Sequence, residues 1–329
     1  MGKAKVPSTL QDAIVYFSDY QNCKDFMVML RWPDGKIQCP ACGSEHVKYL
    51  DKARVFKCYG KHEKPKFSLK TGTIFEDSPI GLEKWLPVVW MVVNCKNGIS
   101  SWEIHRAMGV TQKTAWFMLQ RARLAMQDDR SGGMLGGQVE IDESFIGGKA
   151  RNMHKVRKER AQAGGDRNTG WKTVVFGMLE RDGRVRAAVL PDRKNVSIRP
   201  VVKANVQPGT EIFSDEHGHI WKMDEYTHNV INHLEAYVDG NVHTNGIENF
   251  WSLLKRGLGG TYVSVEPFHL FRYVDEQAFR FNYRKLTDAD RFAIAMSQVV
   301  GRRLTYQELI GKQEPEAGAS PADTTETPF

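Results

Sequence analysis

Four side chains in the first quarter of the sequence have the types and spacing of a metal site. Cys39 and Cys42 form a Cys-x-x-Cys knuckle with a glycine directly after it, and Cys58 follows after fifteen further residues. The residue three places beyond Cys58 is a lysine, so His62 is the expected fourth ligand, with His46 as the alternative. Three thiolates and one imidazole suit the closed tetrahedral coordination of structural Zn2+.

Three acidic side chains further along could hold a second kind of metal centre. Asp142 lies on the polar face of an expected strand, Asp215 ends a later strand, and Glu248 comes early in an expected helix. In a ribonuclease-H-like sheet this order brings together an acid from the first strand, one from the fourth and one from a later helix. Three carboxylates can hold two Mg2+ ions, which activate the attacking oxygen and stabilise the leaving oxygen of phosphoryl transfer.

The helix that carries Glu248 has a polar stripe within HTNGIENFWSLLKRG, residues 243–257. At 3.6 residues per turn, Asn245, Glu248 and Lys255 fall on one side and the apolar residues lie towards the other. Such a stripe commonly faces water. Beside two further acids it would line a catalytic cleft, with Lys255 and its neighbour Arg256 on DNA phosphate.

A helix-turn-helix is expected between these two groups, with Gly109 at the turn and Thr111 as the N-cap of the second helix. The positions that such a unit buries are all apolar: Ile104, Met108, Val110, Ala115 and Met118. The side chains expected to contact DNA are Gln112, Lys113 and Thr114 at the start of the second helix, and Arg121 and Arg123 later in it. A generic helical hairpin would bury the same residues.

The net charge of +7 favours a polyanionic partner, and most of the excess lies in one segment. Residues 147–172 form a basic insertion whose expected phosphate contacts are Lys155, Arg157 and Lys158; a solvated loop is the alternative. The five cysteines, an odd number without an export signal, favour reduced thiols and a cytoplasmic protein. No apolar run is long enough to cross a membrane.

The elements that must position these residues give an α/β fold class with a mixed sheet. The expected domains are a helical segment over 1–35, a zinc ribbon over 36–76, a helix-turn-helix region over 80–130, a ribonuclease-H-like catalytic domain over 137–310 and a disordered tail over 311–329. Within the catalytic domain we expect strands near 138–148, 172–180, 183–192, 210–215 and 227–231, and helices near 197–205, 243–257 and 266–285. The second and third strands form a hairpin across Asp182 and Gly183.

Five blocks of this sequence resemble the DDE insertion-sequence transposases of the ISXO2-like, or IS1595, family. They are CPACGS, TGTIFE, VEIDESFIGGK, FSDEH and HTNGIENFWSLLKRG, and the resemblance runs from about residue 20 to residue 285. It implies a ribonuclease-H-like domain that uses Mg2+, or Mn2+ in its place, with Asp142 and Asp215 as the two aspartates, Glu248 as the third acid and Lys255 as the downstream basic residue. Some members carry Asn instead of the third acid, so Asn245 and Asn249 are alternative ligands.

The expected function is that of a DNA transposase, which binds the terminal inverted repeats of an insertion sequence, cleaves the strand and transfers its 3′-hydroxyl to target DNA. The expected partners are double-stranded DNA and further copies of the chain, as a homodimer or higher oligomer, in the nucleoid of a bacterial or archaeal cell. Two alternatives are a non-catalytic DNA-binding regulator with the same N-terminal half, and a ribonuclease-H-like nuclease that cuts without joining.

Overall fold

The computed structural model describes residues 7–128, 132–148, 172–215, 223–231 and 244–312. The predicted contacts Lys155, Arg157 and Lys158, and almost all of the predicted tail, lie outside these residues. The chain forms two compact units. Among the described residues, the first combines those up to Gln127 with those of 283–312, and the second consists of those of Asp128–Asn282.

The first unit is mainly helical and is built around aromatic side chains. Its helices are α1 (Leu10–Ser18), α2 (Tyr20–Arg31), α3 (Leu82–Asn94), α4 (Ser101–Met108), α5 (Gln112–Leu124), α10 (Asp288–Ser297) and α11 (Tyr306–Leu309). Phe292 of α10 packs its ring 5.6 Å from that of Phe26 and 5.0 Å from that of Trp90. The segment after residue 282 therefore belongs to this unit, whereas we predicted a catalytic domain that continues to residue 310.

A small antiparallel sheet follows α2 in the first unit. It consists of β1 (Val47–Leu50), β2 (Val55–Cys58) and β3 (Lys66–Phe67) in the order β1-β2-β3, with the 3-10 turn η1 (Asp51–Ala53) between the first two strands. Phe56 lies at its centre, with ring centroids 4.8 Å from Tyr49 and 5.2 Å from Phe67. One face of the sheet is thus an aromatic core, and the other face carries exposed and half-buried side chains.

The second unit is a mixed α/β domain around a sheet of five strands, as the patterning predicts. The strands are β4 (Gln138–Ile146), β5 (Thr173–Glu180), β6 (Val185–Leu190), β7 (Glu211–Asp215) and β8 (Thr227–Ile231), in the order β6-β5-β4-β7-β8. The first three are consecutive antiparallel strands, while β7 is parallel to β4 and β8 is parallel to β7.

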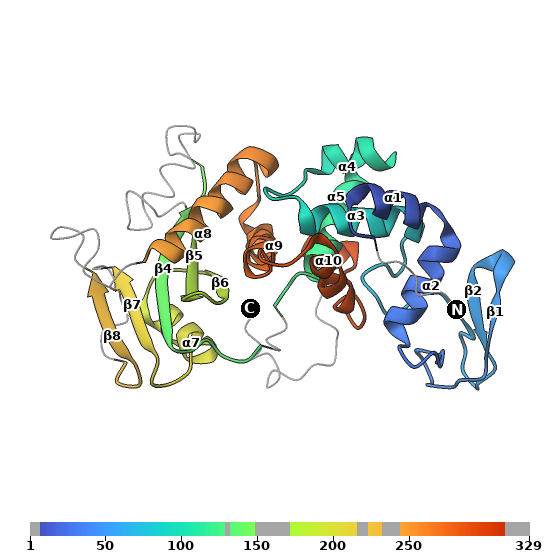
Figure 1. Ribbon diagram of the computed structural model, residues 1–329, viewed down its shortest axis with the longest axis horizontal. Coiled ribbons are helices and arrows are strands. Elements are labelled where there is room, and N and C mark those ends of the chain that lie inside the picture. The colour runs from blue at the N-terminus through green and yellow to red at the C-terminus, as the bar shows by residue number, and fades with distance from the viewer. Residues whose placement is uncertain (1–6, 129–131, 149–171, 216–222, 232–243, 313–329) are drawn as a thin grey trace. The chain divides into compact units, whose positions relative to one another are not determined.

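Helices cover both faces of this sheet (Figure 1). They are α7 (Asn195–Asn205), α8 (Asn245–Arg256) and α9 (Leu270–Asn282), with the short helical turns η3 (Gly257–Tyr262) and η4 (Pro267–His269) between the last two. Val139 and Ile141 of β4 belong to the core under α7, while α8 and α9 pack on the other face. The two-residue period of a strand therefore turns Glu140 and Asp142 towards α8. No helix in the described part of the chain combines the length and apolar character that crossing a bilayer requires.

Candidate functional site

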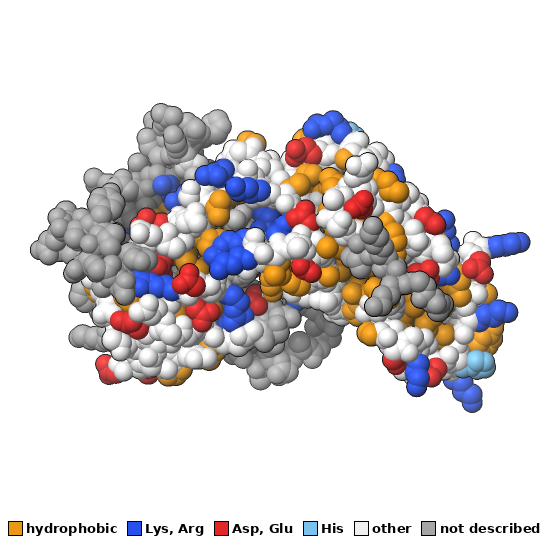
Figure 2. Space-filling view, in the orientation of Figure 1, with side chains coloured by type: hydrophobic (Ala, Val, Ile, Leu, Met, Phe, Trp, Pro, Cys, Tyr) orange, Lys and Arg blue, Asp and Glu red, His pale blue; other side chains and the backbone are white. Residues whose placement is uncertain are grey.

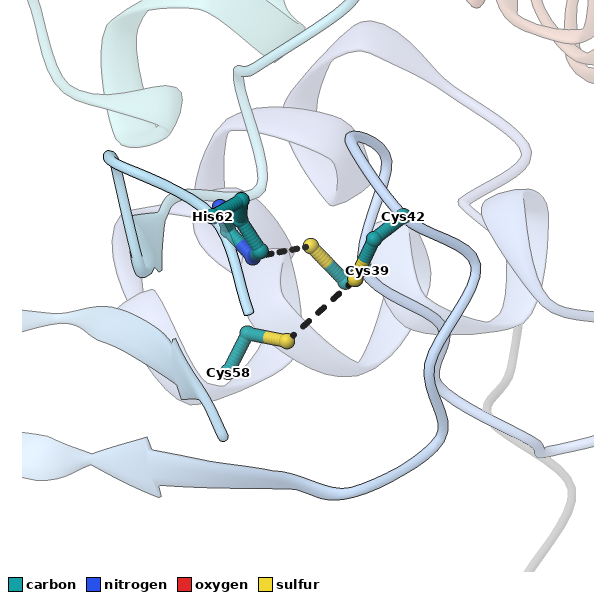
Figure 3. Close-up of side chains that lie close together, drawn as sticks. All are labelled: Cys39, Cys42, Cys58 and His62. Atoms are coloured by element: carbon teal, nitrogen blue, oxygen red, sulfur yellow. Dashed lines mark hydrogen bonds between the residues drawn. The ribbon is translucent and has the colours of Figure 1, made fainter. Parts of the chain in front are cut away.

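The four predicted zinc ligands come together in the first unit (Figure 3). The ligand atoms of Cys39, Cys42, Cys58 and His62 all lie within 4.8 Å of one another. The Sγ of Cys39 is 3.5 Å from Nε2 of His62, and the Sγ atoms of Cys42 and Cys58 are 3.6 Å apart. With Zn–S bonds of about 2.3 Å and Zn–N bonds of about 2.1 Å, tetrahedral ligands lie about 3.6–3.8 Å apart. The cluster therefore fits structural Zn2+.

The backbone around Cys39 prepares it as a metal ligand. Burial raises the pKa of its thiol, but hydrogen bonds from the backbone N–H groups of Ala41 and Cys42, together with those from the thiols of Cys42 and Cys58, outweigh that effect and hold the pKa below its usual value. The turn is closed by the N–H of Gly43, which donates to the carbonyl of Cys39 over 2.8 Å. Thiolate is the form that binds metal, so this knuckle favours the binding state.

The alternative ligand His46 has a different environment. Its ring stacks on that of Tyr59, with the centroids 4.8 Å apart and the planes at 29°. In the part of the chain that the structure describes, the metal-binding cluster contains His62 and leaves His46 out.

Helices α4 and α5 form a tight hairpin with Gly109 at its turn. Gly109 adopts a φ of 58°, a left-handed conformation that favours glycine, and its N–H closes α4 on the carbonyl of His105. Thr111 caps α5 by accepting a hydrogen bond from the N–H of Thr114. Of the five predicted apolar positions, Ile104, Val110, Ala115 and Met118 are buried, and Met108 is half-buried.

The side chains predicted to contact DNA bases lie at the start of α5, and their polar atoms have partners in the same unit. Gln112 is half-buried and donates through Nε2 to the hydroxyl of Ser101 over 2.8 Å. The hydroxyl of Thr114 lies 2.8 Å from that of Thr111. Lys113 is the exposed member of the three, with its Nζ 4.8 Å from the ring of Tyr306.

Arg121, a predicted phosphate contact, is buried in the first unit. The residue is 3% exposed, and its guanidinium donates to the carbonyl oxygens of Leu304 over 2.9 Å and Glu76 over 2.6 Å. Arg123 is buried as well. The part of α5 around these two residues is buried on all sides, so neither side chain reaches the surface.

The strand register relates the two predicted catalytic aspartates. Parallel strands β4 and β7 pair Gln138 with Glu211 and Glu140 with Phe213. The same register, extended by two residues, aligns Asp142 with Asp215, the last residue of β7. The side chain of Asp215 lies outside the described residues.

Two hydrogen bonds fix α8 along β4, next to Asp142. Oε2 of Glu140 accepts from the backbone N–H of Ile247 over 3.0 Å, and Oδ2 of Asp142 accepts from Nε1 of Trp251 over 2.9 Å. Two residues of strand span about 6.6 Å and four residues of helix about 6 Å, so strand and helix run in step. The structure thus brings Asp142 against the helix that carries Glu248.

The remaining predicted residues of α8 are exposed. Glu248 faces solvent within the first turns, where it accepts a long hydrogen bond of 3.5 Å from the hydroxyl of Thr244. The other exposed predicted residues of this helix are Asn245, Asn249, Lys255 and Arg256. Figure 2 shows Lys and Arg side chains over the region in which Figure 1 draws α8 and α9.

Glu140 is a residue of this site that the sequence-based prediction missed. It is 1% exposed, and its second carboxylate oxygen accepts from Nε of Arg181 over 3.1 Å. Its position two residues before Asp142, on the same strand face, was the available signal. An acidic residue on the polar face of a strand is expected at the surface. Glu140 is buried because α8 packs over it, and its carboxylate holds the start of that helix.

Two family models match parts of this chain. Residues 134–282 match the ISXO2-like transposase domain, and residues 18–60 match the transposase zinc-ribbon domain. A protein of Halobacterium salinarum, described as an uncharacterized protein in transposable element ISH50, is 27% identical over 253 residues, which cover 74% of this chain and 84% of the relative. No solved structure matches the chain. The first matched domain ends at residue 282, where the second unit also ends.

Proposed function

We propose that this chain, which carries an ISXO2-like transposase domain behind a transposase zinc-ribbon domain, is a DNA transposase that moves an insertion sequence by cut-and-paste transposition. It binds the terminal inverted repeats, cleaves the DNA strand at the end of the element, and transfers the freed 3′-hydroxyl to target DNA. The observation that carries this proposal is the hydrogen bond from Trp251 to Asp142, because it holds an acid of the sheet against the helix of Glu248.

The order of the strands supports a ribonuclease-H-like fold for the second unit. Strand β7, the fourth in chain order, lies beside β4, the first. That arrangement aligns Asp142 with Asp215 in the extended register, as a catalytic centre with acids on the first and fourth strands requires. Helix α8 then supplies the third acid from above the sheet.

Asp142, Asp215 and Glu248 are the residues that would hold two Mg2+ ions. When bound, such ions activate the attacking oxygen and neutralise charge on the leaving oxygen of phosphoryl transfer. The protein contributes carboxylate oxygens, which are the ligands that Mg2+ prefers, and Trp251 orients one of these carboxylates. Glu248 is exposed and so is accessible to DNA.

Basic side chains position the DNA beside these acids. Lys255 lies seven residues after Glu248, two helical turns further along α8, and Arg256 follows it. Both are exposed and are suited to contact phosphate, which orients a DNA strand without sequence preference. Lys155, Arg157 and Lys158 of the basic insertion extend this contact.

Sequence recognition falls to the first unit. We propose that α4 and α5 form a helix-turn-helix in which the N-terminal end of α5, with Gln112, Lys113 and Thr114, meets base edges in the major groove. The zinc ribbon binds DNA next to it. Because an insertion sequence has two ends, the complex on DNA contains two or more copies of the chain.

A strand-transfer assay tests this function. Labelled terminal-repeat duplexes and a supercoiled plasmid are incubated with the full chain in Mg2+, and we expect joined products that disappear in EDTA. A protein that binds the repeats without nicking them would be a DNA-binding regulator. One that nicks them but never joins them to the plasmid would be a nuclease, and either result would overturn the proposal.

A further inference from the structure

Three lysines lie side by side across the whole sheet of the zinc ribbon. Lys48 of β1 pairs with Lys57 of β2, and Lys57 pairs with Lys66 of β3. Residues directly opposite each other in antiparallel strands place their side chains on the same face of a sheet. Phe56, the neighbour of Lys57, belongs to the aromatic core, so the lysines occupy the other face, where Lys48 and Lys66 are exposed and Lys57 is half-buried. We call Lys48, Lys57 and Lys66 the lysine row.

The lysine row is an unfavourable arrangement for the free protein. Adjacent strands are about 4.8 Å apart, and like charges directly opposite each other destabilise a sheet. Among the ion pairs that join described residues, none includes a lysine of the row. Residues 36–67 carry eight Lys and Arg against three Asp and Glu, so the neighbourhood adds positive charge to the row. Folding by itself gives no reason for this pattern.

An exposed aromatic ring borders the row. Tyr59 follows Lys57 by two residues and is 48% exposed, and Nζ of Lys57 lies 5.1 Å from the centre of its ring. The ring also stacks on the imidazole of His46. In Figure 2, Lys and Arg side chains project from the part of the molecule in which Figure 1 draws β1 and β2, with apolar or aromatic and His side chains among them.

We propose that this face of the zinc ribbon, the lysine row bordered by Tyr59, is a docking surface for the phosphate backbone of duplex DNA. The row is about 10 Å long, and each strand of duplex DNA carries one negative charge per about 3.4 Å of the axis, so about three phosphates of one strand fall within the length of the three lysines. Bound phosphate replaces the repulsion within the row by attraction. The inference rests on the proposed function, and it assigns to the ribbon a phosphate contact separate from base recognition by α5.

The test compares two triple variants of the full chain that remove the same charge. The row variant is Lys48→Gln/Lys57→Gln/Lys66→Gln. The control is Lys36→Gln/Lys52→Gln/Lys84→Gln, at three exposed lysines outside the row. Affinity for a duplex of random sequence and for a terminal-repeat duplex is measured as a function of salt concentration, and bound zinc and Tm verify folding.

Each phosphate contact contributes about 0.9 to the slope of log K against log salt. We expect the row variant to lose up to about 2.7 of this slope, or about 500-fold in affinity at 0.1 M salt, equally on both duplexes. The slope of the control variant should fall by less than about 1. Equal slopes for the two variants, or a loss confined to the terminal-repeat duplex, would overturn the inference.

A single variant keeps the test decisive if the row variant fails to fold. Lys57→Gln should lower the slope by about 0.9, and its Tm at low salt should equal or exceed that of the wild type because the central repulsion is gone. A lower Tm with an unchanged slope would show that Lys57 is a structural residue and would refute the inference. A different result would refute the proposed function itself: if the wild-type chain binds neither duplex, both the proposed function and this surface are refuted.

Discussion

Glu140 and Ile247, 107 residues apart in the chain, are joined by a hydrogen bond of 3.0 Å from the backbone N–H of Ile247 to the buried carboxylate of Glu140. Ile247 lies in the first turn of α8, where backbone N–H groups have no partner within the helix and the helix dipole favours a negative charge. Arg181 donates to the other oxygen of the same carboxylate. A single side chain thus fixes the start of the helix that carries Glu248 to the strand that carries Asp142.

Glu140→Gln tests this anchor. The amide keeps the shape of the buried carboxylate but removes the counter-charge of the half-buried Arg181, so we expect the free energy of unfolding to fall by about 1.5–3 kcal/mol. We also expect DNA cleavage to decrease at a temperature where the variant is folded, because α8 is displaced. Urea denaturation measures the first effect. Glu225→Gln, at an exposed pair with Lys203 in the same unit, is the control and should change stability by less than about 1 kcal/mol.

Trp251→Phe tests the orientation of Asp142. Phenylalanine retains most of the buried ring but cannot donate the hydrogen bond to Oδ2. Because partners of metal-ligating carboxylates commonly contribute 10–100-fold, we expect cleavage to fall by about that factor and to recover in part at high Mg2+ concentration. Cleavage titrations in Mg2+ measure the change. Wild-type rates at all Mg2+ concentrations would contradict the proposed role.

The catalytic acids should separate chemistry from binding. Asp215→Asn and Glu248→Gln should leave folding and end binding intact while cleavage falls by several orders of magnitude, since a two-metal clamp is broken. Lys255→Ala should cost less, because it orients phosphate without holding a metal.

Asn245→Ala and Asn249→Ala examine the alternative third ligand. Normal cleavage by Glu248→Gln, together with an inactive asparagine variant, would move the third ligand to that asparagine. Normal cleavage by all of these variants of α8 would remove this helix from the catalytic centre.

His62→Ala and His46→Ala form a matched pair for the zinc site. His62 supplies the imidazole closest to the thiolates, so its loss should release zinc and lower the Tm, because binding of a structural metal contributes to folding free energy. His46→Ala should keep one zinc per chain and lose only the ring contact with Tyr59. Elemental analysis with a thermal scan measures both. Full zinc in His62→Ala would show that the fourth ligand is another group.

Local patterns in the sequence predicted most of the elements of the second unit. Alternation of apolar and polar residues located β4 and its polar face, and the Asp-Gly pair at 182–183 located the turn between β5 and β6. The helix expected over 266–285 is shorter, because it starts with a 3-10 turn at Pro267 and ends at Asn282. These features depend on residues that are close together in the chain, so they can be predicted from the sequence.

The features that the sequence could not predict depend on contacts between distant parts of the chain. Arg121 donates to Leu304, 183 residues away, so the burial of this cation depends on a partner that no local pattern identifies. The amphipathic pattern of α10 likewise shows that Phe292 has a buried side, but not that Trp90 is its neighbour. The role of Glu140 escaped prediction for the same reason.

Glycine at positions 177 and 246 determines how thick the layer of sheet and helix can be. A Cβ atom at residue 177 would lie 2.7 Å from the ring of Trp251, and one at residue 246 would lie 2.5 Å from Leu179 and 2.8 Å from Glu140. Side chains of α8 therefore pack against the backbone of β5 at residue 177, and the backbone of α8 at residue 246 packs against side chains of the sheet. A methyl group added at either position would push α8 away from the sheet. Catalytic groups tolerate displacements of only about 0.5 Å. The distance between Asp142 on the strand and Glu248 on the helix thus depends on glycine at these two positions.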